Sequence, residues 1–312
     1  MKHYVLVCLL LLLAASGYGL AQTYAMHIKV VHGDGSVTIY SNTDSTAAAA
    51  CGDSFQQAWT NIQSGDVIEL PAVQNCNLTF VEDVSFPDGD FKVVGMGPDL
   101  TSITAIEIDE HSGSAVFEGM TLNVAGCPDN DECMAPFYLQ ADDGTNPWGS
   151  VGQLTLRNVN IVSGGGPVVW ADGQDNPTTT NILLDHVNIT NPGPALWMLN
   201  TGTAEIRNST LTDTGASVLQ AIYGTTINVY DSILQETTGS NTLISMEYVW
   251  GGTINAYAGT SLIAPTGVPV WNGCSSNNSS GMGQLNLYPG SYVSSHLVTT
   301  GNCHLIHRMP SQ

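Results

Sequence analysis

The phrase LRNVNI at residues 156–161 returns along the chain as LDHVNI at 184–189, IRNSTL at 206–211 and VYDSIL at 229–234, with a weaker FEGMTL at 117–122. The four clear copies begin 28, 22 and 23 residues apart. Self-similarity at this period is typical of solenoids, in which each short unit packs against its neighbours. The phrase therefore predicts that one structural unit is restacked through much of the second half of the chain.

Alternation of apolar and polar residues within the phrase assigns its faces. Leu156, Val159 and Ile161 are expected to point inward, because successive side chains of a strand lie on opposite faces. Asn158 then falls at a bend between two strands. Stacking the copies brings the following residues to that bend: Gly119, Asn158, His186, Asn208 and Asp231. Amides in such a column predict an asparagine ladder that satisfies backbone groups of the turn.

Two rows of outward side chains flank the bend. The row before it contains Glu118, Arg157, Asp185, Arg207 and Tyr230, and the row after it contains Thr121, Asn160, Asn188 and Thr210. In one interpretation of the first row, Asp185 holds a cation or a proton while Arg157 and Arg207 act on an acidic sugar, so these three are the candidate catalytic residues. In the other, the row is an alternating-charge ladder in which each exposed pair contributes about 0–1 kcal/mol.

His186 is the only histidine in the middle of the repeats, and it directly follows Asp185. A histidine beside a carboxylate is a natural candidate for a general base. Its position in the bend column favours the other interpretation, a structural histidine that forms hydrogen bonds.

The first 22 residues form a typical secretory signal peptide. A basic tip at Lys2 is followed by an apolar run and small residues, with cleavage expected near Ala21 or Gln22. No later stretch is apolar over the length that a bilayer requires. The sequence therefore predicts a secreted, extracellular protein without a membrane span.

Export also bears on the cysteines and the asparagines. Six cysteines follow the signal peptide, an even number that predicts disulfides. Because repeats contact mainly their neighbours, pairs close in sequence are favoured: Cys51 with Cys76, Cys127 with Cys133, and Cys274 with Cys303.

Sequons permit N-glycosylation at Asn77, Asn188, Asn277 and Asn278. Asn208 also lies in a sequon, but its place in the bend column argues against a glycan there.

The chain has 27 acidic and 6 basic residues, which gives a formal net charge of −21 at pH 7. A field of this sign repels nucleic acid, anionic lipid and anionic polysaccharide alike. Charged residues make up only 11% of the chain, so most of its surface must be polar and neutral. The expected partner is an extracellular polysaccharide or a glycoprotein, and nucleic acid is not expected.

The N-terminal part contains its own signals. MHIKVV at 26–31 predicts a strand, and the Ser/Thr/Ala-rich stretch that follows, up to residue 50, is expected to be a loop. Phe55, Ala58, Trp59 and Ile62 share one helical face, which predicts a short helix over about residues 53–63. A helix with one apolar face at this place would cover the exposed end of the stack.

Two stretches of this region resemble a known family. They are SFQQAWTNIQSGDVIELPA at 54–72 and FKVVGMGPDLTSI at 91–103. Both are similar to the opening of right-handed parallel β-helix proteins of the pectin-lyase-like superfamily. The resemblance implies an all-β fold, a single-stranded right-handed parallel β-helix with a short N-terminal capping helix. It implies no particular activity, because the superfamily includes lyases, hydrolases, epimerases, adhesins and inert scaffolds.

Acidic loops at 127–133, 141–144 and 171–175 are rich in oxygen ligands. Calcium takes about six to eight oxygen ligands, and Asp172 and Asp175 are the candidate metal ligands. No loop has the spacing of an EF-hand, so ordinary solvated loops are the alternative. Calcium is the one cofactor that these residues suggest.

Several repeats end in an aromatic residue, and four of these are tryptophans: Trp170, Trp197, Trp250 and Trp271. Rings that face outward would form a platform on which neutral sugar rings stack, and these four are the candidate substrate-binding residues. Rings that face inward would fill a wide corner of the core. Alternation from Val168 favours an inward ring at Trp170 and leaves Trp197 undecided.

Complete catalytic motifs of known pectin-degrading enzymes are missing. Asp142 and Asp143 supply an isolated DD pair, and neither GHG nor RIK occurs. We therefore expect one domain over 23–312, with clear repeats over about 115–271, that acts as a noncatalytic glycan-binding or structural scaffold outside the cell or in its wall. The alternative is a polysaccharide-active enzyme, namely a lyase, hydrolase or epimerase, acting on the outer face.

Overall fold

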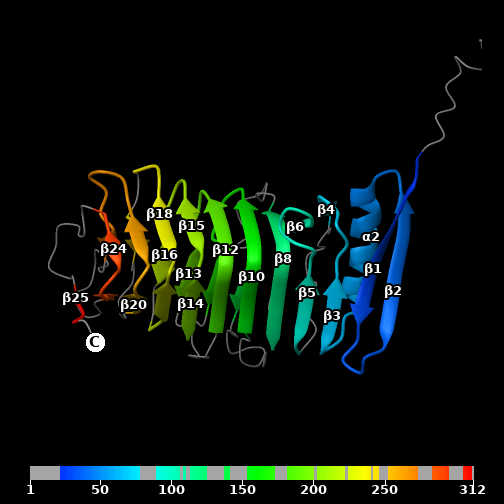
Figure 1. Cartoon of the computed structure of the whole chain (residues 1–312), viewed down its shortest axis with the longest axis horizontal. Helices are drawn as coiled ribbons and strands as arrows, with labels where there is room; N and C mark the ends of the chain where they lie inside the picture. Colours follow the sequence, from blue (N-terminus) through cyan, green and yellow to red (C-terminus); the bar gives the residue numbers. More distant parts are fainter. Residues whose placement is uncertain are drawn as a thin grey trace, which may run out of the picture.

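The computed structural model describes residues 22–77, 89–105, 108–109, 113–124, 137–140, 153–172, 181–199, 202–221, 224–239, 242–245, 252–272, 283–294 and 305–310. Parallel strands dominate this part of the chain, and α2 (Ala47–Thr60) is its one helix. Figure 1 shows the strands side by side along the long axis of the molecule, with α2 at the N-terminal end. Residues 1–21 of the expected signal peptide lie outside the described residues.

Parallel strands form three ladders. The first ladder contains β3 (Asp66–Glu69), β5 (Phe91–Val94), β8 (Ser114–Val124), β10 (Gln153–Ser163), β12 (Asn181–Asn191), β14 (Thr203–Arg207), β17 (Thr226–Tyr230), β20 (Thr253–Ala256), β23 (Gln284–Leu287) and β25 (Leu305–Arg308). The second ladder contains β4 (Cys76–Asn77), β6 (Ser102–Ala105), the second halves of β8, β10 and β12, and then β15 (Thr210–Asp213), β18 (Ile233–Glu236), β21 (Ser261–Ile263) and β24 (Tyr292–Val293). The third ladder contains β7 (Ile108–Asp109), β9 (Phe137–Gln140), β11 (Val169–Asp172), β13 (Leu196–Leu199), β16 (Leu219–Ala221), β19 (Ile244–Ser245) and β22 (Trp271–Asn272). From β8 to β22 the chain passes through the first, second and third ladder in turn and then returns to the first.

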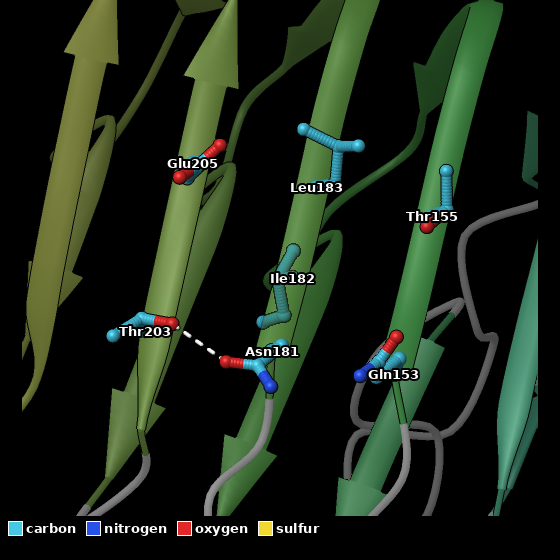
Figure 2. Close-up of a pocket in the computed structure, with 7 residues that line it drawn as sticks. All are labelled: Gln153, Thr155, Asn181, Ile182, Leu183, Thr203 and Glu205. Carbon is cyan, nitrogen blue, oxygen red and sulfur yellow. Dashed lines mark hydrogen bonds between the residues drawn. The ribbon is translucent and has the colours of Figure 1, made fainter.

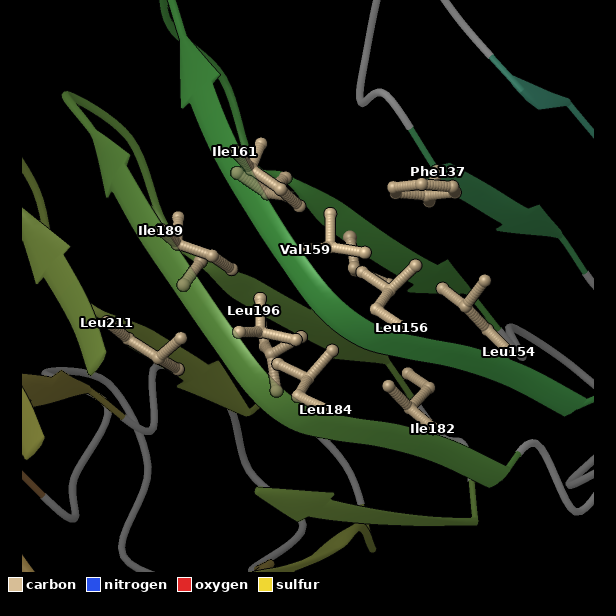
Figure 3. Close-up of a cluster of buried hydrophobic side chains, with 14 of the residues drawn as sticks. Phe137, Leu154, Leu156, Val159, Ile161, Ile182, Leu184, Ile189, Leu196 and Leu211 are labelled. Atoms are coloured by element: carbon tan, nitrogen blue, oxygen red, sulfur yellow. The ribbon is translucent and has the colours of Figure 1, made fainter. Parts of the chain in front are cut away.

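The register predicted from the repeated phrase is confirmed. Leu156 lies opposite both Phe117 and Leu184, Leu184 lies opposite Ile206, and Ile206 lies opposite Val229. All five side chains are buried. Figure 3 shows the inward side chains of β10 and β12 meeting those of the third ladder in one apolar cluster. Stacked aliphatic and aromatic side chains therefore form the core, each buried side chain contributing about 1.5–3 kcal/mol.

The N-terminal end is built differently from the prediction. α2 begins at Ala47 rather than near residue 53, because four consecutive alanines, the strongest helix formers, extend it and the Thr46 hydroxyl caps it by accepting from the Ala49 N–H at 3.1 Å. The stretch expected as a loop therefore contains the start of this helix, and it also contains β2 (Val37–Asp44), which pairs antiparallel with β1 (Tyr24–Val31). α2 packs against β1, β2 and β4, so it covers this end of the ladders.

An edge-to-face series of aromatic rings joins α2 to the ladders. It runs from Phe55 through Trp59, Phe91 and Phe117 to Phe137, with ring centroids 5.8, 5.6, 6.1 and 5.3 Å apart. Such contacts add about 0.5–1.5 kcal/mol each to the effect of burial. The capping helix is thus coupled to the core through aromatic packing.

The bend column is confirmed, but its physical basis differs from the expected asparagine ladder. All five members have a positive φ: Gly119 (69°), Asn158 (51°), His186 (56°), Asn208 (49°) and Asp231 (45°). Glycine, asparagine and aspartate tolerate this left-handed conformation best, which explains the composition of the column. The side chains of Asn158 and Asn208 are exposed, and Asn208 Nδ2 donates to Asp185 rather than to a backbone group. The reason for excluding a glycan at Asn208 therefore does not hold.

Serines next to the bend satisfy the backbone instead. Ser209 Oγ accepts from the Val187 N–H, and Ser232 Oγ accepts from the Ser209 N–H, each at 3.0 Å. Both serines are buried. A serine ladder, one position further along the chain than predicted, therefore supports the bend.

The disulfide between Cys51 and Cys76 is confirmed. It joins α2 to β4, with an S–S distance of 2.09 Å and a Cα–Cα distance of 5.2 Å. The other two predicted pairs, Cys127 with Cys133 and Cys274 with Cys303, lie outside the described residues.

Candidate functional site

Three neighbouring strands of the first ladder present a regular array of outward side chains, here called the outer grid. It consists of Gln153, Thr155 and Arg157 on β10, Asn181, Leu183 and Asp185 on β12, and Thr203, Glu205 and Arg207 on β14. The strands pair in register, so equivalent positions form three rows across the sheet. The first row is neutral, the middle row is mixed and the third row is charged.

A shallow groove of about 220 Å³ lies over the first two rows of the outer grid. Figure 2 shows the residues that line it: Gln153, Thr155, Asn181, Ile182, Leu183, Thr203 and Glu205. Within it the Thr203 hydroxyl donates to Asn181 Oδ1 at 2.7 Å. Amide and hydroxyl groups thus surround the aliphatic surface of Leu183, a combination that suits a small molecule with both hydroxyl groups and an apolar face.

Charges of the third row are compensated by their neighbours. Arg157 lies between two carboxylates, with Nη1 3.9 Å from Glu118 Oε2 and Nε 3.7 Å from Asp185 Oδ2. Lys92 contacts the same Glu118 oxygen at 2.7 Å. These side chains are partly exposed, so each pair is expected to contribute only about 0–1 kcal/mol. Arg157 and Asp185 therefore meet as predicted, in the arrangement of an alternating-charge ladder.

Arg207 is adjacent to Asp185 in register but is engaged elsewhere. Its guanidinium pairs with Glu205 on its own strand, and its Cζ lies 5.6 Å from the centre of the Tyr230 ring. A cation over an aromatic face is an attractive contact. The third candidate catalytic residue thus points toward Glu205 and Tyr230, away from the pair formed by Arg157 and Asp185.

His186 pairs with Asp185 at the surface. Its Nδ1 lies 2.8 Å from Asp185 Oδ1, which also accepts from Asn208 Nδ2 at 3.3 Å. The His186 side chain is 63% exposed. If Nδ1 carries the proton that Asp185 accepts, Nε2 is left as an acceptor facing solvent. The hydrogen-bonding histidine expected in the bend column is thus paired with the carboxylate of the preceding residue, Asp185.

Two further ladders on the same face escaped prediction. Tyr230, Tyr257 and Tyr288 stack with centroids 4.4 and 4.3 Å apart, and burial raises the pKa of Tyr257 and Tyr288 above the ordinary value. Two residues earlier, Asn255 Nδ2 donates to Asn228 Oδ1 and Asn286 Nδ2 donates to Asn255 Oδ1, at 2.8 and 2.7 Å. Their sequence signal is the recurrence of INVY at 227–230, INAY at 254–257 and LNLY at 285–288. Ring stacking and amide hydrogen bonds thus link the successive strands of the C-terminal repeats.

Trp170 and Trp197 lie on the outer side of the third ladder. Their rings are stacked, with centroids 4.9 Å apart and an interplanar angle of 6°. The inward orientation expected for Trp170 is wrong, because Val168 and Val169 are both buried where the chain turns into β11 and alternation counted from Val168 is out of phase. Since this pair belongs to the third ladder, it does not share a groove with the outer grid on the first.

The remaining tryptophans do not extend this pair. Trp271 is fully buried and lies opposite Ile244 in the third ladder, so its ring is part of the core. Trp250 lies outside the described residues.

Metal-binding and glycosylation predictions are only partly covered by the structure. Asp172 ends β11, but its side chain and all of Asp175 lie outside the described part of the chain. Among the residues that the structure describes, no three histidine, cysteine or acidic side chains are grouped closely enough to hold a metal ion.

Of the expected glycosylation sites, Asn188 is exposed on the second half of β12, where its Nδ2 donates to Asn160 Oδ1 at 3.0 Å. The side chain of Asn77, and Asn277 and Asn278, are not described.

Comparison with models of known protein families, with curated protein sequences and with solved structures finds no match to this chain. Within the described residues, α2 falls short of the length and apolarity that a membrane-spanning helix requires. A function is therefore inferred from the geometry of the outer grid.

Proposed function

We propose that this chain is a secreted right-handed parallel β-helix of the pectin-lyase-like type that binds a neutral extracellular glycan without chemical turnover. The observation that carries the proposal is the groove over the neutral and mixed rows of the outer grid, in which the charges of Glu205 and of the third row are already paired with those of neighbouring side chains. Binding rather than chemistry is the role that such a surface supports.

The path of the chain supports the β-helix. Three parallel ladders visited in a fixed order, with one bend residue of positive φ in each of five successive repeats, are expected of a coil wound around an apolar core. The disulfide between Cys51 and Cys76 supports export, since such bonds persist in oxidising compartments.

Charge and lining support a neutral ligand. The net charge of −21 disfavours an anionic polysaccharide, and the groove offers hydroxyl and amide groups around Leu183, together with the Glu205 carboxylate that Arg207 pairs with. Sugar rings expose hydroxyl groups at their rim and an apolar C–H face, which match these two features.

Replacing Asn181 by alanine tests the groove. We expect Asn181→Ala to weaken binding of a soluble neutral polysaccharide about tenfold, the equivalent of about 1.4 kcal/mol, because one amide in the groove is lost. Titration calorimetry with neutral glucans and mannans, and with polygalacturonate as the anionic comparison, measures this change.

The matched control is Asn160→Ala. Asn160 also lies outward and is hydrogen-bonded to a neighbouring strand, but it belongs to the second half of β10, away from the groove. Its removal should leave the affinity unchanged. Equal losses in both variants, preference for the anionic polymer, or no binding of any neutral polymer by the unaltered protein would contradict the proposal.

A polysaccharide-active enzyme is the second candidate, and the exposed pair of His186 and Asp185 beside Arg157 is the observation that favours it. If His186 acts as a general base, His186→Asn should lower the release of unsaturated or reducing sugars by about 100-fold or more, with an unchanged melting temperature. Asparagine suits the backbone because Asn158 and Asn208 occupy the same column. No sugar release by the unaltered protein, with and without calcium, would remove this candidate.

A further inference from the structure

A column of buried polar residues lies where the second ladder ends and the chain turns toward the third. In four successive repeats it contains Ser163, Asn191, Asp213 and Glu236, and the last three pair in register across neighbouring strands. The relative exposure of each of the last three is 1%. Buried polar groups are costly unless they are hydrogen-bonded, so the partner of each atom matters.

The turns beside this column stack with close contact between their backbones. A Cβ added to Gly193 would lie 2.2 Å from the Gly166 carbonyl oxygen of the preceding turn, and one added to Gly215 would lie 2.6 Å from the Pro192 carbonyl oxygen. Both glycines are therefore required by close backbone approach. The polar side chains of the column therefore lie beside tightly stacked backbone.

Asn191 has a fixed orientation. Its Nδ2 lies within hydrogen-bond distance of three backbone carbonyls, those of Gly166 (2.7 Å), Gly193 (2.9 Å) and Pro194 (3.2 Å). The opposite amide orientation would place the oxygen against these carbonyls. Oδ1 consequently faces away from them, is buried and has no donor.

Asp213 has the complementary deficiency. Its Oδ1 accepts from the Gly215 N–H at 2.5 Å and from the Ala216 N–H at 2.6 Å, whereas its buried Oδ2 has no donor. Two acceptors without donors thus lie on in-register neighbours of one column. A proton on Oδ2 would make it a donor, and Asn191 Oδ1 is the acceptor on the neighbouring residue that lacks one.

Glu236 differs from Asp213 in its partners. Its Oε1 accepts from the N–H and the hydroxyl of Thr238 and from the Gly239 N–H, and its Oε2 accepts from the Gly239 N–H at 3.0 Å. Both oxygens of Glu236 therefore have donors, whereas Oδ2 of Asp213 has none. In the described part of the chain, Glu236 is the titratable group that faces Asp213, because the positions toward β10 carry the neutral Asn191 and Ser163.

We propose that Asp213 is protonated in the folded protein at neutral pH and donates a hydrogen bond from Oδ2 to Asn191 Oδ1. The column then acts as a pH-sensitive lock on the turns that join the second and third ladders. Burial raises the pKa of Asp213, the N–H groups of Gly215 and Ala216 oppose this effect, and the charge of Glu236 adds to it. The stabilisation is complete below the unfolded-state pKa of about 3.8 and is lost as pH rises through the higher folded-state value.

Asp213→Asn tests the lock, because asparagine keeps an acceptor for Gly215 and Ala216 and supplies a permanent donor toward Asn191. We expect this variant to melt about 8 °C or more above the unaltered protein at neutral pH, because asparagine removes a proton uptake on folding that spans about three pH units. The difference should disappear below about pH 4, where the aspartic acid is protonated in both states. A lower melting temperature at neutral pH, or a difference independent of pH, would overturn the proposal.

Glu236→Gln is the matched control within the same column. It brings an amide NH₂ against donors and should lower the melting temperature at neutral pH, so opposite responses of the two variants identify which carboxyl holds the proton. Infrared spectroscopy gives a readout that does not depend on stability. A protonated-carboxyl C=O band at neutral pH should be present in the unaltered protein and absent from Asp213→Asn, and a spectrum without this band in the unaltered protein contradicts the lock.

Discussion

Phe91→Ala is expected to lower the free energy of unfolding by about 3–5 kcal/mol, the cost of emptying a buried phenylalanine site. Phe91 is the middle ring of the aromatic series and contacts Trp59 on one side and Phe117 on the other, edge to face. Truncation therefore leaves a cavity and also breaks the packing between α2 and the ladders. Urea unfolding monitored by tryptophan fluorescence and circular dichroism measures the loss.

Phe137→Ala is the matched control, because Phe137 ends the same series on the third ladder. A similar global loss is expected from this variant, but hydrogen exchange in α2 should remain slow. In Phe91→Ala, exchange in α2 should become faster than in the ladders. Equal exchange of α2 in the two variants would contradict the role of Phe91 in holding the helix.

Removal of the disulfide by Cys51→Ala with Cys76→Ala is expected to cost about 3 kcal/mol, through the entropy gained by an unfolded chain that is no longer closed between these residues. The two cysteines are 25 residues apart, and the bond fastens α2 to β4. Chemical denaturation of the double variant under nonreducing conditions measures the change.

Reduction of the unaltered protein provides the comparison. If the bond between Cys51 and Cys76 carries the effect, the double variant should unfold at a lower denaturant concentration whether or not reductant is present. An unchanged midpoint in the double variant would mean that α2 is held by its packing alone.

Repetition made the ladders predictable. Once LRNVNI and LDHVNI are aligned, Leu156 must lie beside Leu184 and Arg157 beside Asp185, since a shift by one residue would expose the apolar side chains. The charged row and the bend column follow from the same alignment. Each copy of the phrase independently places apolar residues at the same inward positions, so the copies support one another.

Predictions failed where the period is interrupted. The alanine run before Cys51 has no apolar periodicity that would predict a helix, although alanine favours helix wherever packing permits. Trp170 follows a turn that resets the alternation, so counting from Val168 assigned the wrong face. How His186 meets Asp185 depends on rotamers at a bend, which the pattern of residues does not specify.

The buried polar column was overlooked although its signal is present. Alternation continued from Ile189 makes Asn191 an inward residue, and the same count from Leu211 reaches Asp213. Polar residues at inward positions are unusual, and the repeated phrase ends before it reaches them. Their partners come from turns of neighbouring repeats, so only the assembled structure shows that one carboxyl oxygen and one amide oxygen lack donors.

Parallel pairing in register also gives the molecule a mechanical direction. Hydrogen bonds between neighbouring strands run along the long axis, so a tension applied at the two ends loads the strand pairs in series. Each repeat contacts mainly the next one, and each would therefore peel away singly instead of all yielding together. Under tension, the repeats are therefore expected to unfold one after another.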